Sequence, residues 1–347
     1  MSPHIRKLNR IRLAGFIGLL AFFLLAVVIV ENLLVSTLVA FVISYLLNPI
    51  VNNMERNGLS RLWSTALTFL LAGLVIGVTV FLILPNFSSA ILGLQKEAPN
   101  YISGFSQLIE ELEAHLSELF GPLISLDLKE YAVGSLTHGS EVFFNRLPGF
   151  LKQTITVMLL GPFIAFFMVK DGRPLLRRAL NIIPNHIFET ALSLQHQINH
   201  QIGHFVRARL LEALIVGLVT WVGLVLVQFP FSLLLALFAA ITNLIPYIGP
   251  LIGMIPALII ALVNGSSSVE LFLVFSVFAT AQVIDAFLLI PFFVAKIVNL
   301  HPVTVILVII AGSQFMGVLG MIISIPLASA LKVTFETLYL HLTESRI

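Results

Sequence analysis

Long apolar runs, separated by short polar segments, recur along this chain. They cover approximately residues 12–30, 33–51, 62–85, 151–169 and 210–229, followed by a longer apolar region at 231–331. About twenty apolar residues in a helix cross a hydrocarbon core of about 30 Å, so each run is long enough for one span. Alternating segments of the membrane β-barrel kind are not visible. The pattern predicts an all-α, polytopic integral membrane protein with about seven or eight hydrophobic segments.

Composition supports the same class of protein. Hydrophobic residues make up 58% of the 347 residues and charged residues only 10%, whereas about 25% of the residues in a soluble domain are charged. The chain has no cysteine, which excludes disulfides, thiolate metal sites and cysteine nucleophiles. Its net charge is only +2, and the basic residues adjoin apolar runs. We therefore expect membrane lipid, and no nucleic acid, as a partner.

The distribution of Lys and Arg predicts the orientation of the spans. Basic side chains are concentrated in residues 6–12 before the first apolar run, in residues 56–61 between the second and third, and in residues 170–178 after the fourth. Cytoplasmic loops carry an excess of such residues. These three segments are therefore predicted to be cytoplasmic, together with the N-terminus.

The same features predict three regions. Residues 1–85 form N-terminal transmembrane helices, residues 86–150 a non-cytoplasmic helical region, and residues 151–347 a C-terminal transmembrane transport region with a cytoplasmic connector at 170–208. Acidic residues outnumber basic ones in the second region. Apolar residues at helical spacing within 101–120 predict an amphipathic helix that packs on the membrane surface, on the spans or on another subunit.

Three histidines in the connector, His196, His200 and His204, are spaced by four and so share one helix face. Such spacing can build a metal site, but no acidic residue lies between them and the stretch is rich in Gln and Asn. We interpret it as a solvated or interfacial helix face, and we expect neither a metal site nor a cofactor.

The region after residue 231 is interrupted where a spanning helix needs continuity. The segment NLIPYIGPLIGMIPALIIAL begins at Asn243 and contains Pro246, Gly249, Pro250, Gly253 and Pro256. Proline lacks a backbone donor and clashes with the preceding turn, so Pro246 and Pro250 are expected to break the helix. Irregular backbone at membrane depth survives only when it is buried in protein or lines a water-filled cavity, as in the discontinuous helices of transporters. Gly249 and Gly253 would also let another helix approach closely.

A second interruption splits the apolar segment that begins at Pro302. It contains Ala311, Gly312, Ser313, Gln314, Gly317 and Gly320. The stretches GPLIGMIPAL at 249 and GVLGMIISIPLA at 317 both place glycines before an apolar stretch that ends near a proline. The sequence therefore predicts interrupted helical hairpins in the C-terminal half, and it hints that they are duplicated.

Asp285 lies midway along an apolar stretch from 271 to 294. A charged carboxylate at bilayer depth costs about 2.5–3.5 kcal/mol, so it should face a cavity, pair with a cation or hold a proton. Gln282, nearly one turn earlier, is expected to extend the same polar face. Two interpretations stay open: a solute or proton pathway, or a structural role in which Asp285 caps exposed backbone or bonds Lys296 or Asn243. Glu212 is near a predicted span end and is expected at the interface.

Several motifs together resemble the autoinducer-2 exporter family of PerM-like permeases. They are YLLNPIVNNMERNG at 45, FMVKDGRPLLRRALNIIP at 167, IGHFVRARLLEALIVG at 202, NLIPYIGPLIGMIPA at 243, and the ending from Asp285 to GVLGMIISIPLASALK. The resemblance implies a multi-pass protein of the bacterial inner membrane and a homo-oligomer. Members are described as exporters of autoinducer-2, a small furanone-type signal, or as sodium(lithium)/proton antiporters. The chain departs from the family at Ala311, where a glycine is common, and at Val318 and Leu319, where a proline is common.

These observations lead to one main hypothesis, an exporter for a small polar organic solute such as autoinducer-2. No GxxxxGK[ST] loop occurs, so a gradient or a partner must supply the energy, and no catalytic motif such as HExxH or GxSxG suggests an enzyme. The candidate pathway residues are Asn243, Pro246, Tyr247, Gly249, Pro250, Gly253, Gln282, Asp285 and Gln314. The alternatives are a sodium(lithium)/proton antiporter, with a monovalent cation as ligand and Asp285 as its carboxylate, and a membrane scaffold that binds an envelope partner.

Overall fold

The computed structural model describes residue 18 and residues 29–30, 32–120, 128–181, 185–245, 249–265, 267–294 and 300–344. These residues form helices and the turns between them, with no strand in any of these ranges. The predicted all-α class is therefore confirmed. Most of the first predicted span, 12–30, lies outside the described residues.

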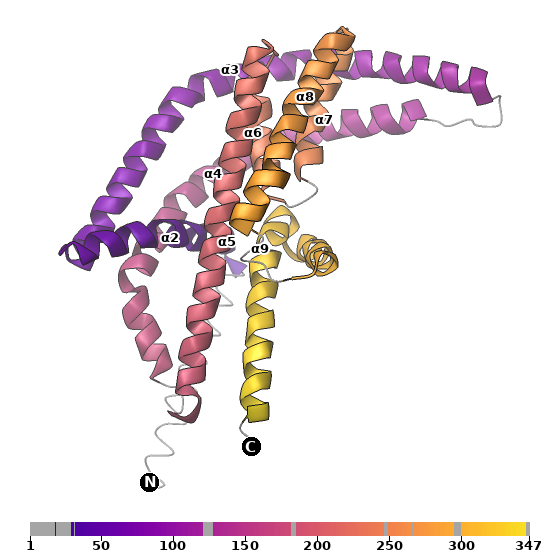
Figure 1. Cartoon of the computed structure of the whole chain (residues 1–347). Helices are drawn as coiled ribbons and strands as arrows, with labels where there is room; N and C mark the ends of the chain where they lie inside the picture. Colours follow the sequence, from indigo (N-terminus) through magenta and orange to yellow (C-terminus); the bar gives the residue numbers. More distant parts are fainter. Residues whose placement is uncertain are drawn as a thin grey trace. The chain divides into compact units, whose positions relative to one another are not determined.

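The helices follow one another along the chain with short connections (Figure 1). They are α2 (Leu33–Arg56), α3 (Arg61–Phe120), α4 (Leu128–Leu180), α5 (Asn185–Leu226), α6 (Ser232–Asn243), α7 (Gly249–Val263), α8 (Ser268–Ile284), the π-helix η1 (Asp285–Val294) and α9 (Pro302–Glu344).

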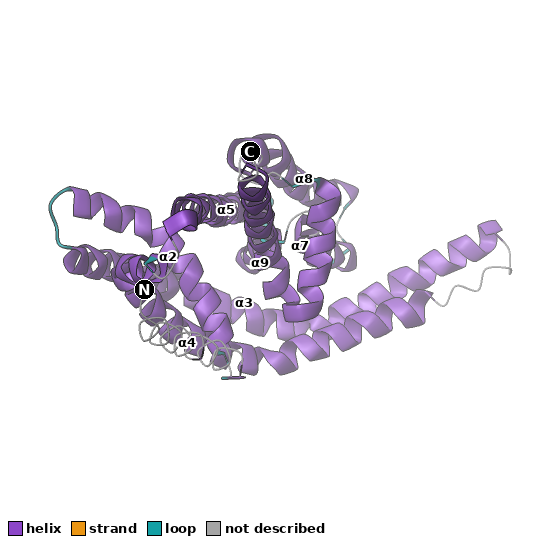
Figure 2. Ribbon diagram, turned by 90° about the horizontal axis from the view of Figure 1, so that it is seen from below, coloured by secondary structure: helices purple, strands orange, loops and turns teal. Residues whose placement is uncertain are grey.

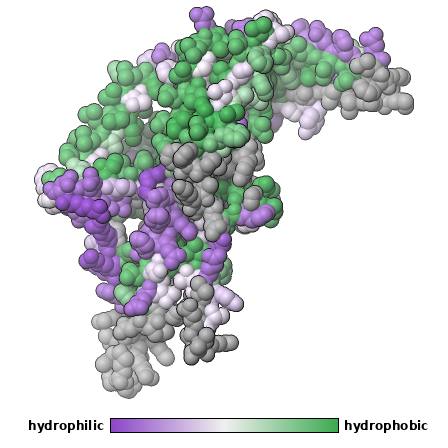
Figure 3. All heavy atoms as spheres, viewed as in Figure 1, coloured by the Kyte–Doolittle hydropathy of each residue, from purple (hydrophilic) through white to green (hydrophobic). Residues whose placement is uncertain are grey.

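Among the described residues, five helical segments are long and apolar enough to cross a membrane. They lie in α2, α3, α4 and α5, and in α8 together with the start of η1. The four runs predicted between residues 33 and 229 fall within the first four of these helices. Large apolar side chains lie exposed on them, and Figure 3 shows hydrophobic residues over much of the visible surface. Such a surface is suited to lipid, which confirms the polytopic membrane class.

The chain forms two compact units. One comprises residues 1–71 and 148–179, and the other comprises residues 72–147 and 180–347. The three boundaries, after residues 71, 147 and 179, fall inside the long helices α3 and α4, which pass from one unit to the other. The three regions predicted from the sequence, with limits at 85 and 150, stay a prediction.

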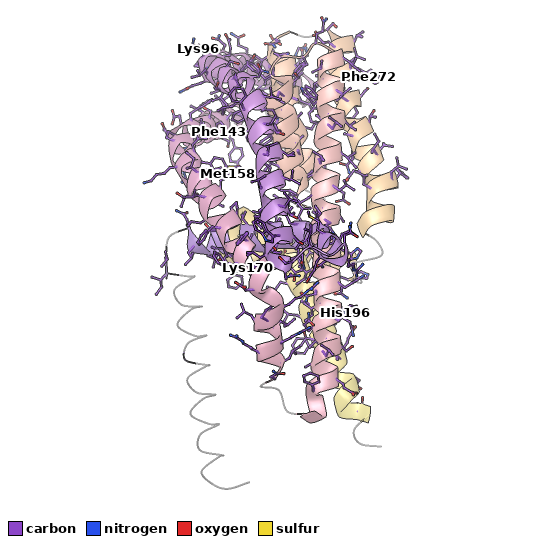
Figure 4. The ribbon with its side chains drawn as sticks, turned by 90° about the vertical axis from the view of Figure 1, so that its left-hand side faces the viewer. Lys96, Phe143, Met158, Lys170, His196 and Phe272 are labelled. Atoms are coloured by element: carbon purple, nitrogen blue, oxygen red, sulfur yellow. The ribbon has the colours of Figure 1, made fainter. Side chains whose placement is uncertain are left out.

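In the first unit, Arg61 holds the end of α2 and the start of α3 against α4. Its guanidinium donates hydrogen bonds to the carbonyl oxygens of Val169 (2.5 Å) and Lys170 (3.3 Å) and to the carboxylate of Glu55 (3.0 Å). Pro174 lies inside α4 and has no N–H for the Lys170 carbonyl four residues earlier, so Arg61 supplies the missing donor. Lys170 marks this place in Figure 4.

Arg173 completes this cluster. It donates to the same Glu55 carboxylate (2.9 Å) and to the side-chain oxygen of Asn52 (2.8 Å). Two motifs that carry the family resemblance, the one at 45 and the one at 167, therefore meet in one set of hydrogen bonds.

In the second unit, α5 is the central helix. It contacts α6, α8, η1 and α9. Of these, α9 lies beside α5 in both ribbon views (Figure 1, Figure 2). The largest apolar core among the described residues joins α5 to α8 and to the hairpin formed by α6 and α7. It is built from Leu224, Phe229, Leu235, Ala239, Ala257, Ile260, Ala261, Val274 and Phe278. A smaller cluster joins Phe205 of α5 to Val305, Ile309 and Ile325 of α9.

The amphipathic segment 101–120 is helical and forms the second half of α3. Tyr101 packs against the largest apolar core, and Gly104 lies so close to Val263 of α7 that an added Cβ would be 2.4 Å from the valine side chain. The start of this segment therefore packs on the helices of its own chain, whereas most of residues 110–118 are exposed.

Both predicted interruptions are present. Between α6 and α7 the chain reverses, and a Cβ added to Gly249 would lie 1.8 Å from the carbonyl oxygen of Thr242. In α9 the helix is broken at Met316 and Gly317, where Gly317 has a φ of 58°. There a Cβ on Gly320 would lie 1.9 Å from the carbonyl oxygen of Gly312. Only glycine allows backbones to approach so closely, so the glycines are required by both hairpins.

The role expected for Pro250 was wrong in one respect. It is the second residue of α7, in the first turn of the helix, where the missing N–H would have no helical partner. Pro250 therefore begins a helix and does not break one. Pro246 and Tyr247 lie outside the described residues.

The Gly249 contact makes a direct prediction. Gly249→Ala should lower the free energy of unfolding by about 1–3 kcal/mol, the usual cost of overpacking, because the new methyl group overlaps the end of α6. Gly77→Ala is the matched control, since nothing lies within 4 Å of a Cβ at that helical position. Thermal unfolding of the detergent-solubilised protein measures both, and equal midpoints for the two variants would contradict the close contact.

Candidate functional site

Four polar side chains are buried together in the second unit. Arg209 and Glu212 lie on α5, Asn243 is the last residue of α6, and Asp285 is the first residue of η1. Their exposed fractions are 7%, 0%, 2% and 3%, respectively. Below, these four residues are called the polar cluster. Charged side chains are rarely buried without a partner, and within membrane-spanning segments they mark substrate and ion pathways.

Local helix geometry explains one half of the polar cluster. Arg209 and Glu212 are three residues apart and so share one face of α5. Both side chains interact with Asp285, the first residue of η1. The Nη1 group of Arg209 donates to Oε2 of Glu212 in a short, buried ion pair.

The other half lies where two helices end. Asp285 follows the last α-helical residue of α8, at the start of the π-helical segment. The side-chain amide of Asn243 interacts with its carboxylate, and so does the charge of Arg209. Glu212 is also close enough to Asp285 for the two carboxylates to interact. π-Helical turns are rare in proteins, but those that occur often lie at functional sites. The position of Asp285 agrees with this tendency.

The hydrogen bonding of the polar cluster is incomplete. Two donors, Nε of Arg209 and Nδ2 of Asn243, and two acceptors, Oε1 of Glu212 and Oδ1 of Asp285, are buried without a well-formed hydrogen bond. An unsatisfied buried group costs about 1–3 kcal/mol, so such groups call for an explanation. A ligand or a change of arrangement that used all four would recover that free energy.

The structure brings together some of the predicted site residues. Asn243 and Asp285 are neighbours, as one structural alternative for Asp285 required, whereas Lys296 lies outside the described residues. Gly249 and Gly253 are buried against α6, and a Cβ on Gly253 would be 3.0 Å from Cα of Ala239.

Two predicted residues stand apart from the polar cluster. Gln282 is exposed although Asp285 is buried, so the expected shared polar face was wrong. Gln314 of α9 is exposed as well.

Sequence reasoning missed Arg209 and Glu212. Glu212 was expected at a membrane interface, but α5 continues without a break from Asn185 to Leu226, and α9 covers its middle. Ser329 of α9 donates a hydrogen bond to Gln201 of α5 (2.7 Å), which places this stretch inside the bundle. The available signal was an Arg and a Glu three residues apart among apolar neighbours.

The three histidines of α5 lie on an exposed helix face. His196 (Figure 4), His200 and His204 are all exposed, and the rings of the last two are 4.2 Å apart. Throughout the described ranges no group of three or more His, Cys, Asp or Glu side chains is arranged to hold a metal ion. The prediction of a solvent- or interface-exposed helix face is confirmed.

The buried ion pair gives a testable prediction. Arg209→Met should lower the free energy of unfolding by about 3–5 kcal/mol, because Glu212 would remain charged and buried without a partner. Arg209→Met/Glu212→Met should recover most of that loss. Lys332→Met is the control, since Lys332 and Glu336 form an exposed pair on α9 (3.6 Å) that contributes at most about 1 kcal/mol. Denaturation in detergent measures the free energy of unfolding of each variant. A loss for Arg209→Met no larger than the loss for Lys332→Met would contradict the buried pair.

Comparison with known proteins assigns the chain to a family. Residues 17–340 match the family model described as AI-2E family transporter. The chain is 29% identical over 323 residues to YueF of Bacillus subtilis (strain 168), a candidate transport protein, with 89% of this chain and 85% of YueF covered. It is 29% identical over 339 residues to PerM of Escherichia coli (strain K12), a candidate permease, with 96% and 93% covered.

A third relative carries a more specific name. The AI-2 transport protein TqsA of Escherichia coli (strain K12) is 24% identical over 337 residues, with 97% of this chain and 95% of TqsA covered. The family model covers nearly the whole chain, including both interrupted hairpins and the polar cluster. The protein therefore belongs to the AI-2E family of transporters.

Proposed function

We propose that the protein is a gradient-driven carrier that exports a small polar organic solute across the bacterial inner membrane, with its pathway beside the α6–α7 hairpin. One observation carries the proposal: the helix break begins at Asn243, and the side chain of Asn243 belongs to the buried polar cluster. Discontinuous helices and buried charges at one place are typical of substrate sites in secondary transporters.

The chemistry of the polar cluster favours a hydroxylated solute. Its unpaired atoms are two N–H donors and two carboxylate oxygens. A hydroxyl group both donates and accepts hydrogen bonds, so a compact molecule with several hydroxyl groups can satisfy both kinds of atom. Autoinducer-2 is the first such solute to test, because one relative is named an AI-2 transport protein.

A sodium(lithium)/proton antiporter is the second candidate. The observation that favours it is the pair of carboxylates, Glu212 and Asp285, held near each other with one guanidinium. Carboxylate oxygens are suitable ligands for a hard cation. Asn243 and Arg209, however, present N–H donors to the same space, and these groups repel a cation.

Orientation and assembly belong to the same proposal. The basic residues of segments 6–12, 56–61 and 170–178 support a cytoplasmic N-terminus. A homo-oligomer is proposed from the family resemblance. The scaffold is the weakest candidate, because Tyr101 and Gly104, at the start of segment 101–120, pack on helices of this chain.

Flux measurements in proteoliposomes test the proposal. The purified protein should exchange autoinducer-2 across the bilayer, and Asn243→Ala should reduce the rate at least about tenfold, the effect of losing roughly 1.4 kcal/mol of interaction at the pathway. Asn100→Ala is the matched control, since Asn100 lies exposed on α3 and bonds only Glu97 (2.9 Å) among side chains. Equal loss in both variants would contradict a pathway at Asn243.

The same vesicles separate the candidates. Sodium-dependent proton movement without autoinducer-2 flux would favour the antiporter. The absence of both fluxes in a correctly folded preparation would overturn the proposed function.

A further inference from the structure

The charges of the polar cluster do not balance. Arg209 contributes one positive charge, and Glu212 and Asp285 contribute two carboxyl groups. Among the described residues, α5 presents Arg209 and Glu212 to Asp285, α6 presents the neutral Asn243, and α8 has its only charged residue, Glu270, at the opposite end of the helix. The polar cluster therefore contains one carboxyl group more than the single positive charge of Arg209 can balance.

The geometry shows which carboxyl group lacks a direct ion pair. Glu212 accepts a hydrogen bond from Arg209, whereas Asp285 makes no such bond to Arg209: it has the amide of Asn243 beside it and interacts with the charge of Arg209 from farther away. A charge of this kind in a low-dielectric interior costs several kcal/mol, and a carboxylate avoids that cost by taking a proton or by accepting strong hydrogen bonds.

We infer that Asp285 binds and releases one proton in each transport cycle, while the Arg209–Glu212 ion pair stays charged beside it as a fixed counter-charge. This inference rests on the proposed function and adds its energy source: export of the solute in exchange for a proton. The protonated carboxyl group and the bound solute are alternative occupants of one site. When the proton leaves for water, the hydroxyl groups of the solute can donate to the carboxylate in its place.

The unpaired donors explain how the two states differ. Nε of Arg209 and Nδ2 of Asn243 have no well-formed hydrogen bond in the structure, which is the arrangement expected when Asp285 holds a proton. Once the proton has left, both donors belong to side chains that already interact with the carboxylate and can turn toward it. Asn243 ends α6 and Asp285 begins η1. The protonation state of Asp285 therefore determines how strongly the α6–α7 hairpin is held to the end of α8.

The expected coupling is quantitative. If one solute molecule exchanges for one proton, a gradient of one pH unit supports about a tenfold accumulation of solute on the acidic side, because one unit corresponds to about 1.4 kcal/mol. In Asp285→Asn the amide imitates the protonated carboxyl group. This variant should fold, and imposed pH gradients should give no accumulation.

The experiment combines transport with direct detection of the proton. Proteoliposomes with the wild-type protein, Asp285→Asn or Asp285→Glu are loaded with autoinducer-2 and given a pH gradient. Infrared difference spectra of the purified proteins in detergent, without solute, record the protonated carboxyl band as the pH changes. Glu270→Gln is the control, since Glu270 lies in the first turn of α8 and interacts with the N-cap Ser267 through its backbone N–H.

The wild type, Asp285→Glu and Glu270→Gln should show gradient-driven accumulation and a carboxyl band that titrates. Asp285→Asn should lose the accumulation and the Asp285 component of the band, while the components of the other carboxyl groups remain. Accumulation that survives in Asp285→Asn would overturn the inference and leave the exporter intact, and so would a band unchanged by this substitution. A band component lost in Asp285→Asn, in a wild type that transports no autoinducer-2, would support the proton site and reject the proposed solute.

Discussion

Lipid offers no hydrogen bonds, so every backbone group freed by a helix break inside the membrane must find a partner within the protein. This constraint governs the second unit. The chain reverses between α6 and α7, and Gly249 brings the start of α7 against the carbonyl end of α6. The contact buries the broken ends and at the same time fixes the position of Asn243. A second glycine contact, Gly312 with Gly320, does the same for α9.

The first unit compensates a freed backbone group outside the predicted spans, in the basic segment 170–178. Pro174 frees a carbonyl group in α4, and the guanidinium of Arg61 reaches it from the start of α3. The cost of placing a charge there is offset by Glu55, which is bonded by both Arg61 and Arg173. Backbone defects are thus compensated by close backbone packing in one unit and by a charged side chain in the other.

The polar cluster depends both on a helix break and on charged side chains. Its position depends on the α6–α7 break for Asn243 and on the change from α-helix to π-helix for Asp285, and α5 supplies a charged pair between them. The cluster is fully enclosed yet incompletely hydrogen-bonded. A purely structural network would be expected to satisfy its own donors and acceptors. The unpaired atoms are therefore the reason to connect this place with a solute and a proton.

The sequence by itself determined the class of protein, four of the spans, both interruptions and the membership of the family. These follow from local properties: the length of an apolar run, the missing N–H of proline and the small size of glycine. The sequence also indicated that Asp285 is an unusual carboxyl group, because its neighbours along the chain are apolar.

Only the tertiary structure decided which polar groups meet. Glu212 and Arg209 lie more than 70 residues from Asp285 in the sequence, and periodicity on one helix carries no information about the helix opposite. The prediction for Gln282 was wrong for the same reason. Whether a helix face is buried depends on the helix that packs against it, and the sequence of one helix does not show that neighbour. The Arg61 contacts with α4, 108 residues away, likewise depend on packing between helices and not on any local pattern.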